Sequence, residues 1–205
     1  MPTSPVDTLH GDHRLAFAEA VELAFGVLGD DAVGRSWHLP SALSGLSVGG
    51  LAAHLFAGVR RLEVALDELL PDAPVVVGLA EFCGANRVET PEAVDTGLHA
   101  TIRADAEHRA RHGHRPVVER FVELGARLGQ RLAVESLDRL VQVIQVAGGV
   151  TPLSLYLASR VVELVVHADD LACSVGLPLV TSPRARPSPS TYLSSSRGPE
   201  SATWR

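Results

Sequence analysis

The chain of 205 residues contains no lysine, and all 18 of its basic residues are arginines. Catalysis through a lysine Schiff base is therefore excluded. With 24 acidic residues the formal net charge is −6, so the chain lacks the basic character that binding to a nucleic-acid backbone requires. Aromatic residues make up only 4% of the sequence, and the apolar fraction of 46% is therefore mostly Leu, Val and Ala. This composition favours packed helices over a β-sandwich or barrel.

Cysteines and long apolar runs are also scarce. The two cysteines, Cys83 and Cys173, are too few for a disulfide framework in a chain of this size and indicate a reducing, cytoplasmic environment. No apolar run reaches about 18 residues without a charge, so we expect no membrane span. The start, MPTSPVDTLHGDHR, has no secretory signal character. The absence of GxSxG, phosphate-loop and CxxC motifs leaves serine hydrolysis and nucleotide binding without local support.

Helical periodicity predicts several helices along the chain. Ser47 is a good N-cap, and Thr90-Pro91 and Thr151-Pro152 each combine a capping residue with a proline at the first helical position. Together with the breakers between them, these signals predict helices at about 12–29, 47–70, 90–111, 117–134 and 151–175.

The segments between these helices differ in character. Residues 30–45 are expected to form a loop, and 138–150 could be a short strand or an extended connection, because periodicity does not distinguish the two. Residues 71–91 are too many for a tight antiparallel hairpin. They have the length of a crossover between the second and third helices, which parallel neighbours in a bundle require.

Residues 181–205 have a different composition, with seven Ser and four Pro among 25 residues and no periodic apolar pattern. Such a segment cannot bury enough apolar surface to offset the entropy of ordering, so we expect a disordered tail. Its four Arg and one Glu give a local charge of +3, and a basic docking arm is the alternative. Neither a second folded domain nor an internal repeat is visible.

His54, Glu163 and His167 provide the clearest chemical signal. Glu163 and His167 are four residues apart in the apolar run RVVELVVHADDLACSVG, so one helical face would present both side chains. His54 lies in a second apolar run, GGLAAHLFAGV. If the two helices face each other, two imidazoles and one carboxylate converge as in an open site for a catalytic divalent metal.

Each of these residues also has a simpler interpretation. Arg160, Glu163 and His167 would share the solvent-facing stripe of an amphipathic helix, with Arg160 paired to Glu163. A lone histidine on an apolar helix, such as His54, is more often a hydrogen-bonded core residue than a ligand. Against this, Val and Leu surround Glu163, and a carboxylate is costly to bury there unless it is paired or binds a metal.

A second group of histidines, His108, His112 and His114, lies among arginines that would repel a metal, so we expect a solvated surface there. Cys173 is expected to be a small core residue, and Cys83 has no base at a suitable spacing.

Two blocks of the sequence resemble the mycothiol-dependent maleylpyruvate isomerase family. WHLPSALSGLSVGGLAAHL is similar to a block of the family's N-terminal, metal-binding, DinB-like domain, and SRVVELVVHADDLACSVGLP is similar to its second block. The positions that match the second block are Arg160, Glu163, His167, Asp170, Gly176 and Pro178.

The resemblance covers about residues 10–180 and implies an all-α, DinB-like four-helix bundle with a long crossover between helices 2 and 3. It also implies a divalent metal, usually zinc, held by His54, Glu163 and His167. We expect Asp170, one turn past His167, to accept a hydrogen bond from that imidazole, with Arg160 as a further supporting residue. A structural role for Asp170 is the alternative.

The resemblance further implies a low-molecular-weight thiol, such as mycothiol, that adds to a small-molecule electrophile. The reaction would be isomerisation of a maleylpyruvate-type substrate or S-transfer. Family members continue into a smaller C-terminal α/β domain, in whose place this chain has the tail at 181–205, so that domain is expected to be absent. A metal-water hydrolase using the same ligands and a non-catalytic regulatory or partner-binding module are the alternatives. The oligomeric state is not predicted.

Overall fold

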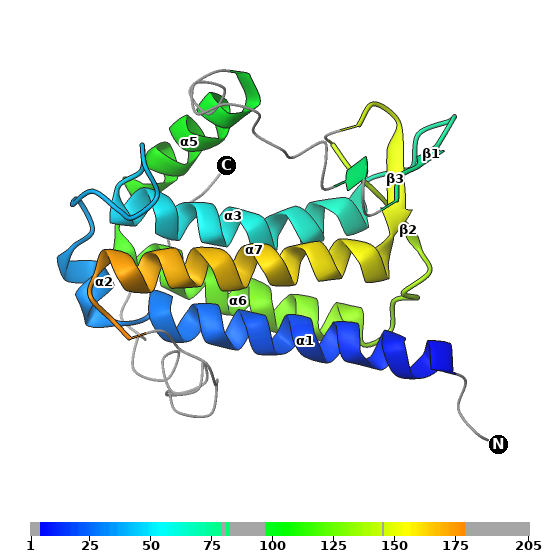
Figure 1. Ribbon diagram of the computed structural model, residues 1–205, viewed down its shortest axis with the longest axis horizontal. Coiled ribbons are helices and arrows are strands. Elements are labelled where there is room, and N and C mark those ends of the chain that lie inside the picture. The colour runs from blue at the N-terminus through cyan, green and yellow to red at the C-terminus, as the bar shows by residue number, and fades with distance from the viewer. Residues whose placement is uncertain (1–4, 79–80, 83–96, 145, 179–205) are drawn as a thin grey trace.

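The computed structural model describes residues 5–78, 81–82, 97–144 and 146–178. Most of these residues are helical, and a small β-sheet accompanies the helices (Figure 1). In chain order the elements are α1 (Pro5–Leu28), α2 (Asp31–Arg35), α3 (Val48–Asp67), β1 (Val75–Val76), α5 (Gly97–Ala110), α6 (His114–Leu132), β2 (Leu140–Gln142), β3 (Gly149–Pro152) and α7 (Leu153–Ser174).

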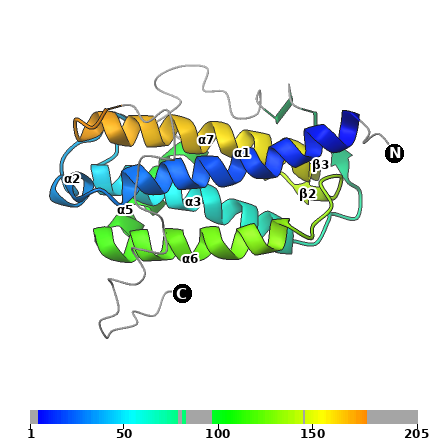
Figure 2. The ribbon, with the colours of Figure 1, turned by 90° about the horizontal axis from the view of Figure 1, so that it is seen from below.

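The four long helices α1, α3, α6 and α7 lie side by side along the long axis of the molecule (Figures 1 and 2). Both α6 and α7 pack against α1 and α3, while α5 packs on α3 outside this group. In Figure 1, α1 and α7 run from right to left, and α3 and α6 run from left to right. The helical prediction is therefore confirmed, with the four long helices forming the bundle.

The sequence predicts a crossover between the helices at 47–70 and 90–111, whereas in the structure it connects α3 to α6. The parallel neighbours are α3 and α6, and the chain between them includes β1 and α5. The predicted start of the third helix at Thr90 lies outside the described residues, and α5 begins at Gly97. A crossover after α3 is therefore present, with α5 as part of it.

A three-stranded sheet at one end of the bundle corrects the all-α prediction (Figure 1). The strand order is β1-β3-β2, with β1 parallel and β2 antiparallel to β3. The sequence allows either a short strand or an extended connection at 138–150, and the structure has β2 and the beginning of β3 there. Thr151 lies in β3 instead of capping α7, because its buried hydroxyl donates to the Val77 carbonyl oxygen at 3.0 Å. A strand of two residues such as β1 is too short for periodicity to reveal.

The segment predicted as a loop at 30–45 contains the one-turn helix α2. The Asp30 side chain caps it by accepting a hydrogen bond from the Ala32 amide at 2.9 Å. The prediction of a loop is wrong for these five residues, because a helix this short offers no measurable periodicity.

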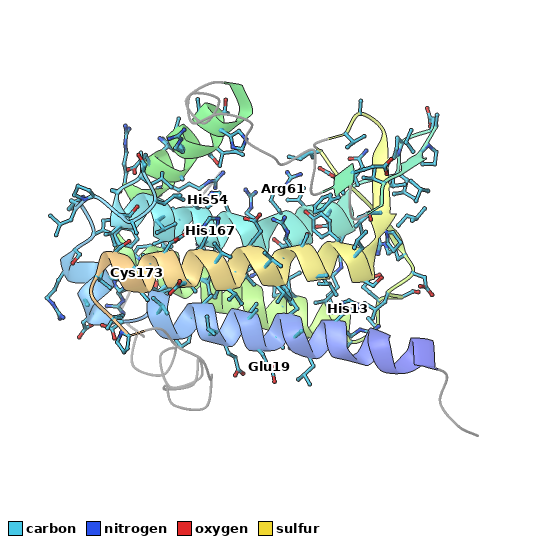
Figure 3. All side chains as sticks on the ribbon, in the orientation of Figure 1. His13, Glu19, His54, Arg61, His167 and Cys173 are labelled. Carbon is cyan, nitrogen blue, oxygen red and sulfur yellow. The ribbon has the colours of Figure 1, made fainter. Side chains whose placement is uncertain are left out.

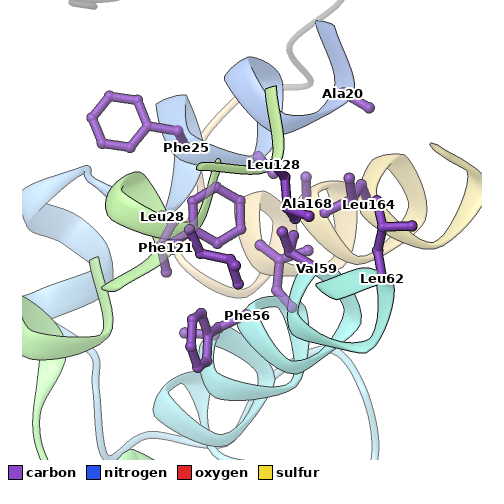
Figure 4. Close-up of a cluster of buried hydrophobic side chains, with 14 of the residues drawn as sticks. Ala20, Phe25, Leu28, Phe56, Val59, Leu62, Phe121, Leu128, Leu164 and Ala168 are labelled. Atoms are coloured by element: carbon purple, nitrogen blue, oxygen red, sulfur yellow. The ribbon is translucent and has the colours of Figure 1, made fainter. Parts of the chain in front are cut away.

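Aliphatic side chains fill most of the interior between the four helices, as the composition predicts. Residues from all four helices meet in the cluster of Figure 4, among them Leu28, Val59, Phe121 and Leu164. Burying one such side chain contributes about 1.5–3 kcal/mol, so this cluster fixes how the helices are arranged. It holds α3 against α7, the two helices that carry His54, Glu163 and His167.

The start of α3 is capped from two sides. Ser47 is the predicted N-cap, and its hydroxyl oxygen accepts from the Gly50 amide at 2.9 Å. From α5, the Glu107 carboxylate accepts from the Ser47 amide at 2.6 Å and from the Ser47 hydroxyl at 3.0 Å. This carboxylate therefore joins α5 to the helix that carries His54.

Replacing Glu107 with alanine is expected to lower the free energy of unfolding by about 1–2 kcal/mol, because it removes two charge-assisted hydrogen bonds at a half-buried position. Asp105→Ala is the control, since among the described residues Asp105 forms an exposed ion pair with Arg109 and no other, and its loss should cost less than about 1 kcal/mol. Urea unfolding monitored by circular dichroism measures both. Equal stability of the two variants would contradict the capping role.

Within the part of the chain that the structure describes, none of the helices has the combination of length and apolar character that a membrane span requires.

Candidate metal centre

His54 projects from α3 toward His167 of α7 (Figure 3), and Glu163, one turn before His167 on α7, brings a third potential ligand to the same place. One ligand atom from each lies within 4.8 Å of the others. The His54 and His167 rings are edge to face, with centroids 4.8 Å apart, and Glu163 Oε2 is 3.3 Å from His167 Nε2. The two separate sequence blocks therefore come together, and the condition that their helices face each other is met.

The alternative interpretation, in which Arg160 lies with Glu163 on a solvent-facing stripe of α7, is wrong for Arg160. That residue is buried, with 8% of its surface exposed, and so does not share a solvent-facing stripe with Glu163. Its Nε donates to the Ser159 hydroxyl at 3.3 Å, and its Cζ lies 5.3 Å from the centroid of the Tyr156 ring. Its charge nevertheless influences the potential ligands, because it helps to lower the pKa values of both His54 and Glu163.

The side chains of His54, Glu163 and His167, here called the triad, are half-buried, and this burial shifts their protonation equilibria. Burial, reinforced by the positive charge of His167, lowers the pKa of His54 to about 4. The hydrogen bond with His167, helped by the charge of Arg160, lowers the pKa of Glu163 despite burial. At neutral pH, His54 is therefore neutral and Glu163 is ionised, which are the protonation states that metal ligands need.

His167 is held from both sides of its ring. Its Nδ1 lies 3.1 Å from Asp170 Oδ2, and its Nε2 faces Glu163. Burial opposes protonation of His167, but the hydrogen bonds to Glu163 and Asp170 outweigh it and raise the pKa of the ring. With the Nδ1 proton directed to Asp170, Nε2 is left to face the other ligands, an arrangement typical of metal-binding histidines.

The other histidine group is only partly on the surface. His108 and His112 are exposed, as expected. The prediction is wrong for His114, which is half-buried: its Nε2 lies 2.7 Å from the Leu28 carbonyl oxygen, and its ring centroid is 5.4 Å from that of Trp37. His114 thus ties the start of α6 to the end of α1, a tertiary contact that local sequence does not reveal.

Within the described residues, no cysteine belongs to the group of potential metal ligands. Cys173 is exposed near the end of α7, so its prediction as a core residue is wrong. The preceding residues Leu171 and Ala172 are the ones that are buried. Cys83 lies outside the described residues.

The donor set of the triad fits a divalent metal. Two imidazole nitrogens and one carboxylate oxygen are the ligands of several catalytic zinc sites, which keep a fourth position for water or substrate. The three atoms approach within 4.8 Å, and metal-ligand bonds of about 2.0–2.2 Å would need only small movements of side chains to close around one ion.

Comparison with protein families matches most of the chain to a known domain. Residues 18–172 match the family described as the mycothiol maleylpyruvate isomerase N-terminal domain. The chain belongs to this family. The match covers more than half of the chain, including α3, most of α7 and all three residues of the triad. A comparison with curated proteins and with solved structures gave no match.

The low pKa of His54 predicts that acid destabilises this member of the mycothiol maleylpyruvate isomerase N-terminal domain family. Between the ordinary histidine pKa of 6.5 and the lowered value of about 4, the unfolded chain binds a proton that the folded chain excludes, so stability falls as pH decreases through this range. The full loss attributable to His54 is about 3 kcal/mol. The raised pKa of His167 acts in the opposite direction, because it stabilises the folded chain at low pH.

The substitution His54→Gln removes the loss of stability that the low pKa of His54 causes in acid. It retains most of the opposing effect of the raised pKa of His167. Unfolding of the metal-free wild type and variant in urea, from pH 7 to 4, gives the difference between their stabilities. That difference should shift in favour of the variant as pH falls. A constant difference would contradict the low pKa of His54.

Proposed function

We propose that the chain is an enzyme that binds zinc through His54, Glu163 and His167 and uses a low-molecular-weight thiol such as mycothiol. The observation that carries the proposal is the approach of the three ligand atoms to within 4.8 Å, in a chain of this family. Zinc bound there would lower the pKa of the thiol, so that the thiolate is available near neutral pH.

The protein's own residues prepare the site for this chemistry. His54 stays neutral at physiological pH and offers a lone pair, while the Glu163 carboxylate compensates part of the charge of the cation. Asp170 accepts the hydrogen bond from His167 Nδ1 and thereby fixes the orientation of the ring. Three side chains from two packed helices are thus oriented before any ligand arrives.

The thiolate sulfur would form a carbon–sulfur bond to the double bond of a maleylpyruvate-type substrate. Rotation about the former double bond and elimination of the sulfur would give the trans isomer and return the thiol. An S-transferase would retain the new carbon–sulfur bond. We further propose that the metal-binding domain comprises about residues 10–180. The reaction would take place in the cytoplasm.

Cobalt substitution tests the metal and the thiol together. The purified chain should bind a single zinc ion, and the cobalt form should develop a thiolate-to-metal absorption band when a low-molecular-weight thiol is added. Turnover of maleylpyruvate should then require that thiol. Hydrolysis without any thiol would favour a metal-water hydrolase, and a chain that retains no metal would contradict an enzymatic role.

A further inference from the structure

The hydroxyl of Ser174, the last residue of α7, forms two hydrogen bonds that join separate parts of the chain. It accepts from the Ala42 amide at 2.8 Å and donates to the Asp170 carbonyl oxygen at 2.6 Å. Asp170 is also the residue whose Oδ2 lies 3.1 Å from His167 Nδ1. One hydroxyl therefore connects the segment between α2 and α3 to the turn of α7 that supports a potential metal ligand.

Ala42 lies in a turn whose two ends are joined by hydrogen bonds. The Ser41 amide donates to the Leu46 carbonyl oxygen at 3.0 Å, and the Ser41 hydroxyl donates to the same oxygen at 2.9 Å. Gly45 has a φ of +83°, a conformation that residues with a Cβ adopt rarely, and it allows the chain to reverse direction here. The turn at 41–46 therefore holds the Ala42 amide in a defined position.

The segment that contains this turn is attached to the start of α3. The Val48 amide donates to the Leu39 carbonyl oxygen, and the Gly49 amide donates to the Trp37 carbonyl oxygen, both at 2.8 Å. The first amides of a helix have no partner within the helix, so these bonds satisfy donors that need an outside acceptor. Trp37 is buried, and its indole nitrogen donates to the Ala110 carbonyl oxygen at 2.8 Å. The segment therefore cannot shift without disturbing the beginning of α3.

The contact between Ala42 and Ser174 lies at the end of the bundle where α3 begins and α7 ends (Figure 1). His54 is seven residues after Ser47, the N-cap of α3. His167 is seven residues before Ser174. At the helical rise per residue, both histidines lie about 10 Å from this end, on helices that run in opposite directions. A bond between the turn and α7 therefore fixes α7 at the level along α3 where the two imidazoles meet.

The position of α7 along α3 matters because a metal centre tolerates little error. A displacement by one residue moves a side chain by about 1.5 Å along the helix axis. A binding geometry has to hold within about 0.5 Å, and metal-ligand distances within about 0.2 Å. The three ligand atoms lie within 4.8 Å of one another, so a displacement of α7 by a fraction of one residue would already impair their closure around an ion.

We propose that Ser174 is a positioning residue for the metal centre, and that through it the turn at 41–46 fixes α7 relative to α3. The hydroxyl acts in two ways. It holds the backbone of Asp170, whose side chain contacts His167, and it ties the end of α7 to the segment that begins α3. The inference rests on the proposed function in one respect, because it takes the triad as the metal ligands.

Ser174→Ala removes both hydrogen bonds and should weaken zinc binding by the folded chain about three- to tenfold. The contact with Ala42 is exposed, so water compensates for part of the loss and the effect should stay below that of removing a ligand. Ser174→Thr retains a hydroxyl and should retain the affinity of the wild type. Competition with a chromophoric chelator measures the affinity, and circular dichroism verifies that each variant is folded. A hydroxyl with a purely structural role would change stability without changing the zinc affinity of the folded chain.

Thr101→Ala is the matched control. The Thr101 hydroxyl also donates to a carbonyl oxygen four residues earlier, that of Gly97 at 3.2 Å, but it does so on α5. This variant should bind zinc as the wild type does, because the lost hydrogen bond lies within a helix that carries none of the triad.

Ala42→Pro removes the amide on the other side of the contact. If Ala42 and Ser174 act through one hydrogen bond, the double variant should bind zinc about as tightly as Ser174→Ala alone, because that bond is already lost. Full additivity of the two single effects would contradict the role of the turn. If Ala42→Pro does not fold, Ser174→Ala and Ser174→Thr decide the question.

A measurement on the metal-free chain separates this inference from the proposed function. The rings of His54 and His167, with centroids 4.8 Å apart, should give a nuclear Overhauser effect between their protons. Ser174→Ala should weaken this signal, and Ser174→Thr and Thr101→Ala should retain it.

Unchanged zinc affinity in a folded Ser174→Ala chain would overturn the positioning role, as would an equal loss of affinity in Ser174→Ala and Ser174→Thr. If the wild type binds no zinc, the proposed function fails and the metal-free signal decides the positioning role. Dependence of that signal on the Ser174 hydroxyl would then support it, and a signal that is equal in the wild type and Ser174→Ala would overturn it.

Discussion

Replacing His167 with alanine is expected to leave the purified protein without zinc. The substitution removes one of three protein ligands, and it also removes the side chain that Glu163 and Asp170 both contact. Loss of a residue that only supports a ligand already lowers metal affinity by about 10–100-fold, so loss of a ligand itself should exceed this range. Elemental analysis after dialysis against a metal-free buffer gives the zinc content for each variant.

Glu163→Ala and His54→Ala should lose zinc as His167→Ala does, because each removes a donor atom of the same triad. His112→Ala is the matched control, since it also removes an imidazole, but from an exposed position in the turn between α5 and α6. Equal zinc content in all of these variants would contradict the proposed centre.

Thermal unfolding distinguishes loss of zinc from loss of the fold. A metal that binds only the folded chain raises its melting temperature in proportion to the logarithm of metal concentration above the dissociation constant. Added zinc should therefore stabilise the wild type and His112→Ala, and should not stabilise a folded His167→Ala. A His167→Ala chain that zinc stabilises as strongly as the wild type would show that the ion binds elsewhere.

The triad could be predicted from sequence because its geometry depends on local rules. Glu163 and His167 are one helical turn apart, so any helix over this run presents them together. The meeting with His54 required an assumption that two helices pack, which the buried cluster between α3 and α7 confirms. The helices themselves followed from periodicity and from caps such as Ser47.

The errors arise where packing and tertiary contacts outweigh local pattern. Arg160 looked like one member of a solvated stripe, but it is buried against Tyr156, and its spacing from Glu163 does not reveal this. His114 lies in a stretch rich in charge and is nevertheless packed on Trp37. Thr151 has the sequence signature of a helix cap, but its hydroxyl donates to the carbonyl oxygen of Val77, just after β1. In each case the environment of the side chain, which the local motif does not encode, decides its role.

Asp170→Asn is expected to lower the affinity for zinc by about 10–100-fold, the second-largest effect that we predict. The substitution retains the size of the side chain but removes its charge, so the contact of 3.1 Å between Asp170 Oδ2 and His167 Nδ1 becomes weaker. It should also bring the pKa of His167 closer to its ordinary value, because Asp170 raises that pKa through both its hydrogen bond and its charge. Competition with a chromophoric chelator measures the zinc affinity.

The control for Asp170→Asn is Asp169→Asn, which removes the same charge one residue earlier on α7. If Asp170 acted only through its negative charge, the two substitutions would weaken zinc binding to similar extents, because neighbouring carboxylates contribute comparable potentials across a half-exposed surface. If it acts by orienting the imidazole, only Asp170→Asn should have the large effect, since the direct contact with His167 belongs to Asp170. Equal affinities for the two variants would therefore reject the orienting role of Asp170 while leaving the three ligands in place.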